Sequence, residues 1–209
     1  MLERNQDLSS GPMWVFPGGS FEPTDGPVPD VEKEADVNWG APQLLTTAAN
    51  AAVRGTTKET GLSCSTASLA WVSHWIPPST GVPKRFATWF FLAPETSGAL
   101  DVDTRNIVQA RWIAPQDALE GYAANEFPMD VPTWSTLDDM RAPTVIGSLI
   151  DRAITQGPRM HHTRAFPTER GLMLVWQGDA AYETRDLDHD GRRNRMLVDQ
   201  NFNVLERSK

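Results

Sequence analysis

The fold is decided by Trp14-Val15-Phe16-Pro17-Gly18-Gly19-Ser20-Phe21-Glu22-Pro23-Thr24-Asp25, taken with Ala51-Ala52-Val53-Arg54-Gly55-Thr56-Thr57-Lys58-Glu59-Thr60-Gly61-Leu62. The first segment is a short apolar run that ends in a Pro-Gly-Gly turn. Glycines permit positive φ there and let backbone amides approach a ligand. The second segment is the end of a helix that we expect over residues 44–60, with Gly61 suited to its C-terminal cap.

The helix over residues 44–60 has a strong first half and a weak second half. Thr46 or Thr47 is the expected N-cap. The apolar residues expected on its buried stripe are Leu45, Ala48, Ala49, Ala52 and Val53. In the second half, Gly55-Thr56-Thr57 costs about 2 kcal/mol relative to the best helix formers, so packing must compensate.

Together the two segments resemble the signature of the Nudix hydrolases, G-x5-E-x7-R-E-U-x-E-E-x-G-U, in which U is aliphatic. The matching positions are Gly19 and Asp25 (Asp for Glu), then Arg54, Glu59, Gly61 and Leu62. Residues 26–42 form an insertion between the halves. That insertion, with Asp at the end of the first half, is similar to the peroxisomal coenzyme A diphosphatase-like branch and its actinobacterial relatives. The resemblance extends over nearly the whole chain.

The resemblance implies an α/β fold, with a mixed sheet sandwiched between helices. We expect one domain over residues 1–209, with 26–42 as an inserted loop and 157–209 as a C-terminal extension. Relatives have two strands before the Trp-Pro-Gly-Gly stretch, whereas residues 1–4 resemble only the end of the second. Most of the N-terminal strand is therefore expected to be missing, and a homodimer could cover the exposed sheet edge.

Hydrophobic periodicity predicts the remaining elements. The expected strands are 68–76, 85–92 and 106–113, and the expected helices begin at Ala114 and span 132–140 and 144–155. Beyond Gly157 the chain is expected to be extended, with 172–176 as its only strong buried strand. Relatives carry Arg-Phe-Asp-Thr-Arg-Phe-Phe where this chain has Arg85-Phe86-Ala87-Thr88-Trp89-Phe90-Phe91, so two inner charged positions have become apolar.

In the family, divalent cations bind carboxylates at i, i+3 and i+4 on one helix face. The corresponding residues here are Gly55, Lys58 and Glu59. A glycine offers no oxygen and a lysine repels a cation, so the formal charge of the triplet changes from −3 to 0. No tightly bound cofactor is expected, and the resemblance implies Mg²⁺ or Mn²⁺ only if other ligands have replaced the lost ones.

Such a displaced metal site would use Glu22, Asp25 and Glu59, with Glu95, Asp101 or Asp103 as further candidates. Alternatively, Glu22 and Asp25 only hold the turn. Lys58 and Arg54 could bind a phosphate without metal, or Lys58 could pair with Glu32 or Glu34. The candidate site is thus Glu59 and Arg54 as catalytic residues, with Gly18, Gly19, Glu22, Asp25 and Lys58 as ligand-binding residues.

These residues leave three functions open. The first is a Nudix-fold protein that binds a nucleoside-diphosphate-linked or coenzyme A-like small molecule, with metal-dependent hydrolysis weak or lost. The second is an active diphosphatase on such a compound, with relocated metal ligands. The third is a metal-free biosynthetic enzyme on the same scaffold.

Composition argues against nucleic acid and membranes as partners. With 19 basic and 27 acidic residues and a pI near 5.0, the chain has no nucleic-acid footprint. No apolar run approaches the roughly 18 residues of a membrane span, and one cysteine, Cys64, fits a reducing cytosol. Cys64 is expected to be a buried small hydrophobe. Adjacent His161 and His162 should point to opposite faces of a strand, and 186–191, half of a calcium loop, is expected to be an exposed turn.

Overall fold

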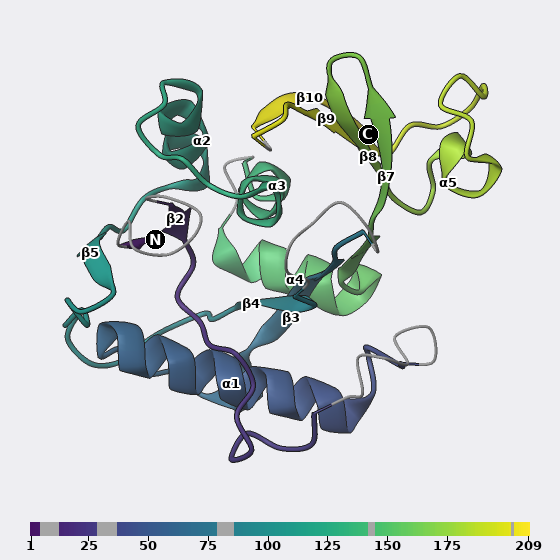
Figure 1. Cartoon of the computed structure of the whole chain (residues 1–209). Helices are drawn as coiled ribbons and strands as arrows, with labels where there is room; N and C mark the ends of the chain where they lie inside the picture. The colour runs from purple at the N-terminus through teal and green to yellow at the C-terminus, as the bar shows by residue number, and fades with distance from the viewer. Residues whose placement is uncertain (5–12, 29–36, 79–85, 142–144, 202) are drawn as a thin grey trace.

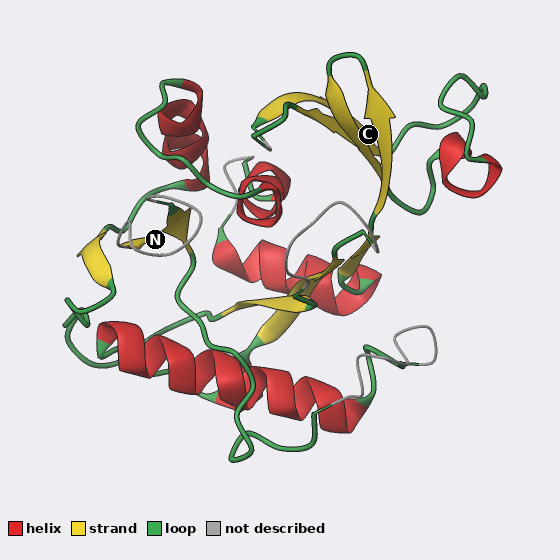
Figure 2. Cartoon of the chain, in the orientation of Figure 1, coloured by secondary structure: helices red, strands yellow, loops and turns green. Residues whose placement is uncertain are grey.

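The computed structural model describes residues 1–4, 13–28, 37–78, 86–141, 145–201 and 203–209. Figure 1 shows the elements in layers. From the bottom of the view, the long helix α1 lies under a small sheet, and helix α4 lies over it. Above these are helices α2 and α3 and a second sheet formed by the C-terminal strands. Figure 2 shows the alternation of helix and strand that makes this an α/β fold, as the sequence predicts.

The described strands form three sheets, of order β2-β1-β5, β4-β3-β6 and β10-β9-β8-β7. The strands are β1 (Leu2–Arg4), β2 (Trp14–Val15), β3 (Ala70–Ile76), β4 (Thr88–Leu92), β5 (Ile107–Ala110), β6 (Arg159–His162), β7 (Arg164–Thr168), β8 (Gly171–Val175), β9 (Arg195–Val198) and β10 (Val204–Ser208). The helices are α1 (Pro42–Thr60), α2 (Pro115–Ala123), α3 (Val131–Asp139), α4 (Ile146–Gln156) and α5 (Ala180–Thr184), with a 3₁₀ turn over Thr66–Ser68.

The sheet β4-β3-β6 is the centre of the fold. Strand β3 pairs antiparallel with β4 and parallel with β6, in a register that places Trp75 opposite His161. Helix α4 packs on β3 while α1 contacts β4, and Figure 1 places the two helices on opposite faces. A mixed sheet sandwiched between helices, the expected architecture, is therefore present.

Helix α1 differs from its prediction at its N-terminal end. It begins at Pro42, whose missing N–H is no loss in a first turn. The N-cap is Ala41, with no side-chain cap, so the prediction of Thr46 or Thr47 was wrong. The Thr47 hydroxyl donates instead to the carbonyls of Gln43 and Pro27. At the other end Gly61 has φ 70° and its N–H donates to the Thr57 carbonyl, as predicted.

The buried face of α1 is also rotated from the expected stripe. Its buried residues are Leu44, Thr47, Ala48, Ala49, Ala51, Gly55 and Thr60, whereas Leu45, Ala52 and Val53 are half-buried. At Gly55 a small residue is needed because Gly18 and Gly19 approach the helix closely there.

The C-terminal region contains more strand than the sequence indicates. Besides β8, all four residues of β9 are buried, so the expectation of a single strong buried strand was wrong. Strand β9 begins with an arginine, so its apolar run is too short to be recognised from hydrophobicity. Arg195 is paired with Asp179, the N-cap of α5, which accepts hydrogen bonds at 2.8 and 2.6 Å from Nε and Nη2.

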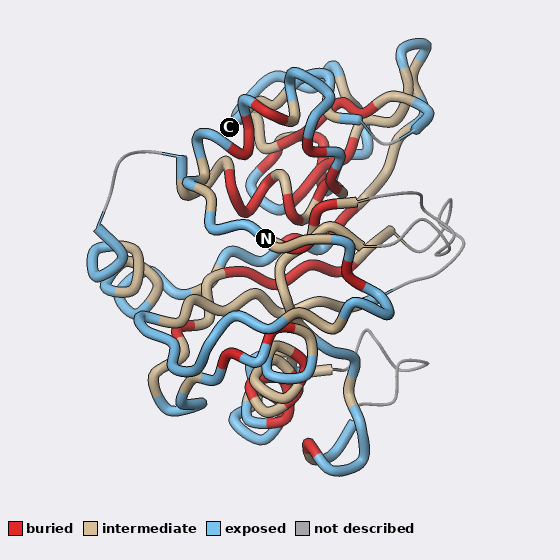
Figure 3. The backbone as a smooth tube through the Cα atoms, turned by 90° about the vertical axis from the view of Figure 1, so that its left-hand side faces the viewer, coloured by how far each residue is buried: buried red, intermediate tan, exposed pale blue. Residues whose placement is uncertain are grey.

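Buried residues occur in most layers of the molecule, as the red segments in Figure 3 show. One cluster joins β2 to α2 and α3 through Trp14, Leu119 and Leu137. A second cluster joins the central sheet to the C-terminal sheet through Trp75 and Trp176, whose rings meet edge to face at 5.3 Å. The residues 157–209, expected as an extension, therefore contribute to the buried interior.

Strand β1 is short, as the sequence predicts. It lies between β2 and β5, with Leu2 opposite both Val15 and Ala110. Among the described strands β5 pairs with β1 alone. Val108 within β5 is 58% exposed, and Trp112 just beyond it is 76% exposed. Dimerisation through this edge stays a prediction.

Candidate functional site

The two signature segments come together where the Pro-Gly-Gly turn lies across α1. Gly55 is buried directly beneath Gly18 and Gly19: a Cβ at position 55 would lie 2.3 Å from the Gly18 carbonyl carbon and 2.4 Å from the Gly19 nitrogen. These separations are far below van der Waals contact, so only glycine fits. The residue that weakens α1 is thus required by the turn, and this packing compensates for its low helix propensity.

Arg54 holds the first signature segment onto α1. Its Nε and Nη2 donate to the two carboxylate oxygens of Asp25 at 2.9 and 2.8 Å. Its Nη1 donates to Glu22 Oε1 at 2.8 Å, and Nη2 also reaches the Ser20 carbonyl at 2.6 Å. The Asp25 side chain is 3% exposed, and its hydrogen bonds from Arg54 lower the pKa of that carboxyl. Both carboxylates of the turn are therefore paired with one guanidinium, and the three side chains keep a formal charge of −1.

Glu59 is likewise engaged. Arg4 Nη2 donates to Oε1 at 2.8 Å, and the Gly18 amide donates to Oε2 at 3.0 Å. The Glu59 side chain is 15% exposed, so little of it faces solvent. A carboxylate in this position ties β1, the glycine turn and α1 together. The backbone N–H of Gly18, expected to face a ligand, is consumed in this contact.

The remaining charged candidates lie at the C-terminal end of α1. Lys58 is exposed, and its charge helps to lower the pKa of Asp103, after the larger effect of the hydrogen bonds from Arg105. The amides of Asp101 and Asp103 donate to the last carbonyls of α1. Glu95 is exposed. The alternative partners of Lys58, Glu32 and Glu34, lie outside the described residues.

The structure therefore does not assemble the displaced metal site. Among the residues it describes, no group of three His, Cys, Asp or Glu side chains could hold a metal ion. Mg²⁺ requires several oxygen ligands in near-octahedral array. Glu22 and Asp25 face Arg54, while Glu59 faces Arg4, so the donors present do not fit a divalent cation.

An aromatic cluster that sequence reasoning missed lies on the α1 face of the central sheet. Trp89 is at its centre: its ring lies 4.3 Å from His74, 5.6 Å from Trp39 and 5.3 Å from Phe21. His74 is fully buried, and burial lowers its pKa to about 4 against the opposing effect of the Thr88 backbone. Because Trp39 comes from the insertion, only a test of long-range pairing could have found this cluster.

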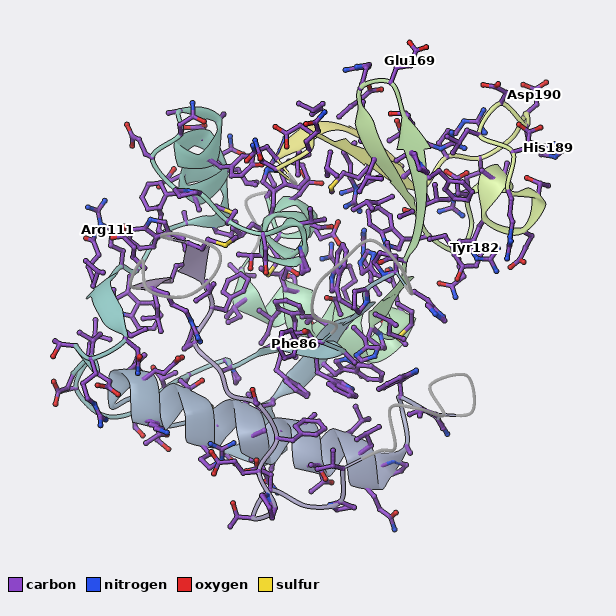
Figure 4. All side chains as sticks on the ribbon, in the orientation of Figure 1. Phe86, Arg111, Glu169, Tyr182, His189 and Asp190 are labelled. Carbon is purple, nitrogen blue, oxygen red and sulfur yellow. The ribbon has the colours of Figure 1, made fainter. Side chains whose placement is uncertain are left out.

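The other sequence features stay outside this site. His161 is buried and His162 exposed, on opposite faces of β6 as predicted. Residues 186–191 form an exposed turn beyond α5, where His189 and Asp190 point away from the molecule (Figure 4). Cys64 is half-buried rather than fully buried. In the described part of the chain, no helix is long and apolar enough to cross a bilayer.

Comparison with known proteins gives a structural match alone. No family model matches the sequence, and no curated protein matches it. Among solved structures, the chain is similar to the crystal structure of a NUDIX hydrolase from Alicyclobacillus acidocaldarius, with a TM-score of 0.55 and 19% sequence identity. The match covers 72% of this chain and 86% of the other. At this identity the likeness establishes the fold: the protein has the α/β architecture of a Nudix hydrolase.

Proposed function

We propose that this Nudix-fold protein binds a small molecule that carries a diphosphate, either nucleoside-diphosphate-linked or coenzyme A-like, and that metal-dependent hydrolysis is weak or lost. One observation carries the second part: Glu22, Asp25 and Glu59 are all paired with arginines. With Gly55 and Lys58 at the other two helix positions, a metal-dependent hydrolase built on this chain would need those oxygens for its cations.

The pairing is hard to exchange for a metal. A cation at Asp25 must displace a guanidinium that forms two parallel hydrogen bonds to a nearly buried carboxylate, the strongest geometry for such a pair. The released Arg54 would then repel the incoming charge. The same contacts argue against a diphosphatase with relocated metal ligands. Glu59 is bound by Arg4 and not by Arg54, so two separate ion pairs would have to break to bring these carboxylates to one metal ion.

The ligand class rests on the resemblance of the sequence to the coenzyme A diphosphatase-like branch. Lys58 supports it physically, since it is exposed one helical turn beyond Arg54. Arg54 is committed to Asp25, so Lys58 is the cation left on α1 that could meet a phosphate as a point charge.

The loss of metal chemistry is tested by titrating the protein with Mn²⁺ in a calorimeter and incubating it with coenzyme A and ADP-ribose, with products separated by chromatography. We expect no saturable Mn²⁺ binding and no Mn²⁺-stimulated cleavage. Mn²⁺-dependent turnover that disappears in Glu59→Gln would overturn the proposal.

A gain-of-site experiment is a further test. Lys58→Glu adds a carboxylate beside Glu59 without touching the glycine turn, and we expect no Mn²⁺ site because Glu59 stays on Arg4 and Gly18. The double variant Gly55→Glu with Lys58→Glu restores both family residues. We expect the new side chain at position 55 to force the Pro-Gly-Gly turn off α1 and to lower the melting temperature. A stable double variant that binds Mn²⁺ would contradict this reading of Gly55.

The ligand is tested separately by calorimetry with coenzyme A and ADP-ribose in the absence of metal. We expect one of them to bind, Lys58→Gln to weaken binding at least ten-fold, and Lys58→Arg to retain it. Equal binding by Lys58→Gln would exclude Lys58 as the phosphate contact, and binding of neither compound would refute the ligand class.

A further inference from the structure

A cavity lies on the face of the central sheet that is opposite α1, between β3, α3 and α4. Its volume is about 130 Å³. A water-sized sphere needs roughly 10–15 Å³ of such volume, so the cavity has room for roughly nine to thirteen such spheres, enough for a small organic ligand. It is below the roughly 300 Å³ at which pockets for larger ligands begin.

One wall of the cavity carries an unsatisfied hydroxyl. Ser73 lines the cavity and is 4% exposed, and its Oγ has no hydrogen-bond partner within the described structure. A buried hydroxyl without a partner costs about 1–3 kcal/mol, so such groups usually have a water or a ligand beside them. Neighbouring Thr136 is satisfied, because its hydroxyl donates to the Pro132 carbonyl.

The cavity is also positively charged. It is lined by Arg152 and Arg159 and by one carboxylate, Asp139, which accepts from Arg159 Nη1 at 2.8 Å and from Lys209 Nζ at 2.9 Å. Arg207 Nη2 also lies 4.0 Å from this carboxylate. The charge of Asp139 is thus shared among several cations, in a chain whose net charge is −8.

Arg152 has donors to spare. Among the described residues, its hydrogen bond goes to the Asp139 carbonyl, from Nη2 at 3.1 Å. A guanidinium carries five N–H donors in a planar fork that matches a carboxylate. The rest of the lining is mixed: Val72, Leu92, Leu149 and Ala153 give it an apolar part, and Gln156 adds a polar side chain.

We propose that this cavity binds a small aliphatic monocarboxylate. The carboxylate meets the Arg152 guanidinium and the Ser73 hydroxyl, and the short hydrocarbon chain lies against the apolar walls. A phosphate would satisfy the arginines but leave the apolar walls without a partner. A neutral molecule of the same shape would fill the walls and leave the positive charge uncompensated.

The probe for the proposal is butyrate, with butyramide as its neutral counterpart and inorganic phosphate as a second anion. Binding to the full chain is measured by calorimetry and by saturation-transfer NMR. A ligand of this size binds with a dissociation constant in roughly the micromolar to millimolar range. We expect saturable butyrate binding, at least ten-fold tighter than that of butyramide or phosphate.

Three variants test the cavity by different means. Arg152→Gln removes the charge, Ser73→Ala the hydroxyl, and Ala153→Leu fills the space while keeping both. We expect at least ten-fold weaker butyrate binding for Arg152→Gln and Ala153→Leu, and about three-fold for Ser73→Ala. The control is Arg170→Gln, an arginine 65% exposed near the tip of the β7–β8 hairpin, which should bind butyrate as the wild type does.

Absence of saturable butyrate binding would overturn the proposal, as would equal affinity for butyrate and butyramide. Equally tight phosphate binding would replace it with a general anion site. Undiminished binding by a folded Ala153→Leu variant would place the ligand elsewhere. Since this cavity and the glycine turn on α1 lie on opposite faces of the sheet, either result leaves the coenzyme A and Mn²⁺ experiments independent.

Discussion

The molecule contains two arginine–aspartate forks, pairs in which one guanidinium donates two hydrogen bonds to one carboxylate. In the C-terminal region Arg195 grips Asp179, and the two side chains are 9% and 0% exposed. On α1 Arg54 grips Asp25 through the same pair of nitrogens, but here the arginine is 28% exposed and also holds Glu22, whose side chain is 51% exposed. One fork is sealed, whereas the other opens to solvent on one side.

Apart from this difference in exposure, the two arginine–aspartate pairs are built alike. Both aspartates also accept backbone N–H groups, and both have lowered pKa values. The Arg54 fork is therefore built as a structural clamp. Its exposed arm, Glu22, is the part that a ligand or a cation could still reach.

The largest effect should come from breaking the sealed fork. Arg195→Met leaves the Asp179 carboxylate charged and buried, so we expect a loss of about 4 kcal/mol in the free energy of unfolding, measured by urea denaturation at pH 7. Arg170→Met, at an exposed arginine, should change it by less than about 0.5 kcal/mol. A loss below about 1 kcal/mol for Arg195→Met would mean that water reaches Asp179.

Breaking the open fork should cost less. For Arg54→Met we expect a loss of about 3 kcal/mol in the same assay, because Asp25 is nearly as buried as Asp179 but the vacated side faces solvent. Adding Asp25→Asn, which removes the unpaired charge, should recover part of the loss. A loss larger than that of Arg195→Met would reverse the ranking of the two forks.

Acidification distinguishes the forks from the buried histidines. Burial, followed by the charges of Arg207 and Arg159, lowers the pKa of His161 to about 3 from an ordinary 6.5. The unfolded chain therefore binds the extra proton first, and stability that is complete above pH 6.5 falls as the pH drops toward 3.

Neither arginine–aspartate fork contributes to the change of stability in the upper part of this pH range. Burial raises the pKa of Asp179, but the hydrogen bonds from Arg195 and the backbone lower it more, to about 2, so its stabilisation is lost only as the pH falls below about 4. From pH 7 to 5.5, His161→Phe should lose about 1.3 kcal/mol less unfolding free energy than the wild type. The exposed His189→Asn should follow the wild type, and identical profiles for all three proteins would exclude His161 as the titrating group.

The smallest effect is expected at the exposed arm. Glu22→Gln removes one partner of Arg54 at a half-exposed position, so we expect a loss under about 1 kcal/mol in urea denaturation. A loss comparable to that of Arg54→Met would show that Glu22, rather than Asp25, is the main partner of the arginine.

The sequence predicts most of the fold because its signals are local. The periodicity of β3 and β4, the proline at the start of α2 and the glycine after α1 each specify their own element. The strand β9 escaped prediction because it begins with Arg195, whose charge is paired with Asp179, the N-cap of a different element.

For the candidate site, the sequence names residues but does not indicate how they are arranged. Gly55 reads in the sequence as a lost metal ligand, whereas in the structure it is the position at which Gly18 touches the helix. Likewise Glu59 matches a signature, but its partner Arg4 belongs to a strand that no local pattern relates to α1. Contacts between segments far apart in the chain decide both roles.

The parallel pairing of β3 with β6 has a consequence for biosynthesis. Ribosomes add roughly 5–20 residues per second and release the N-terminal part first. Strand β3, with its tryptophans, therefore emerges well before the segment that completes its sheet. For that interval the nascent chain presents an aromatic, half-finished edge, so yield in a host cell should depend on chaperone supply more than on the stability of the finished protein.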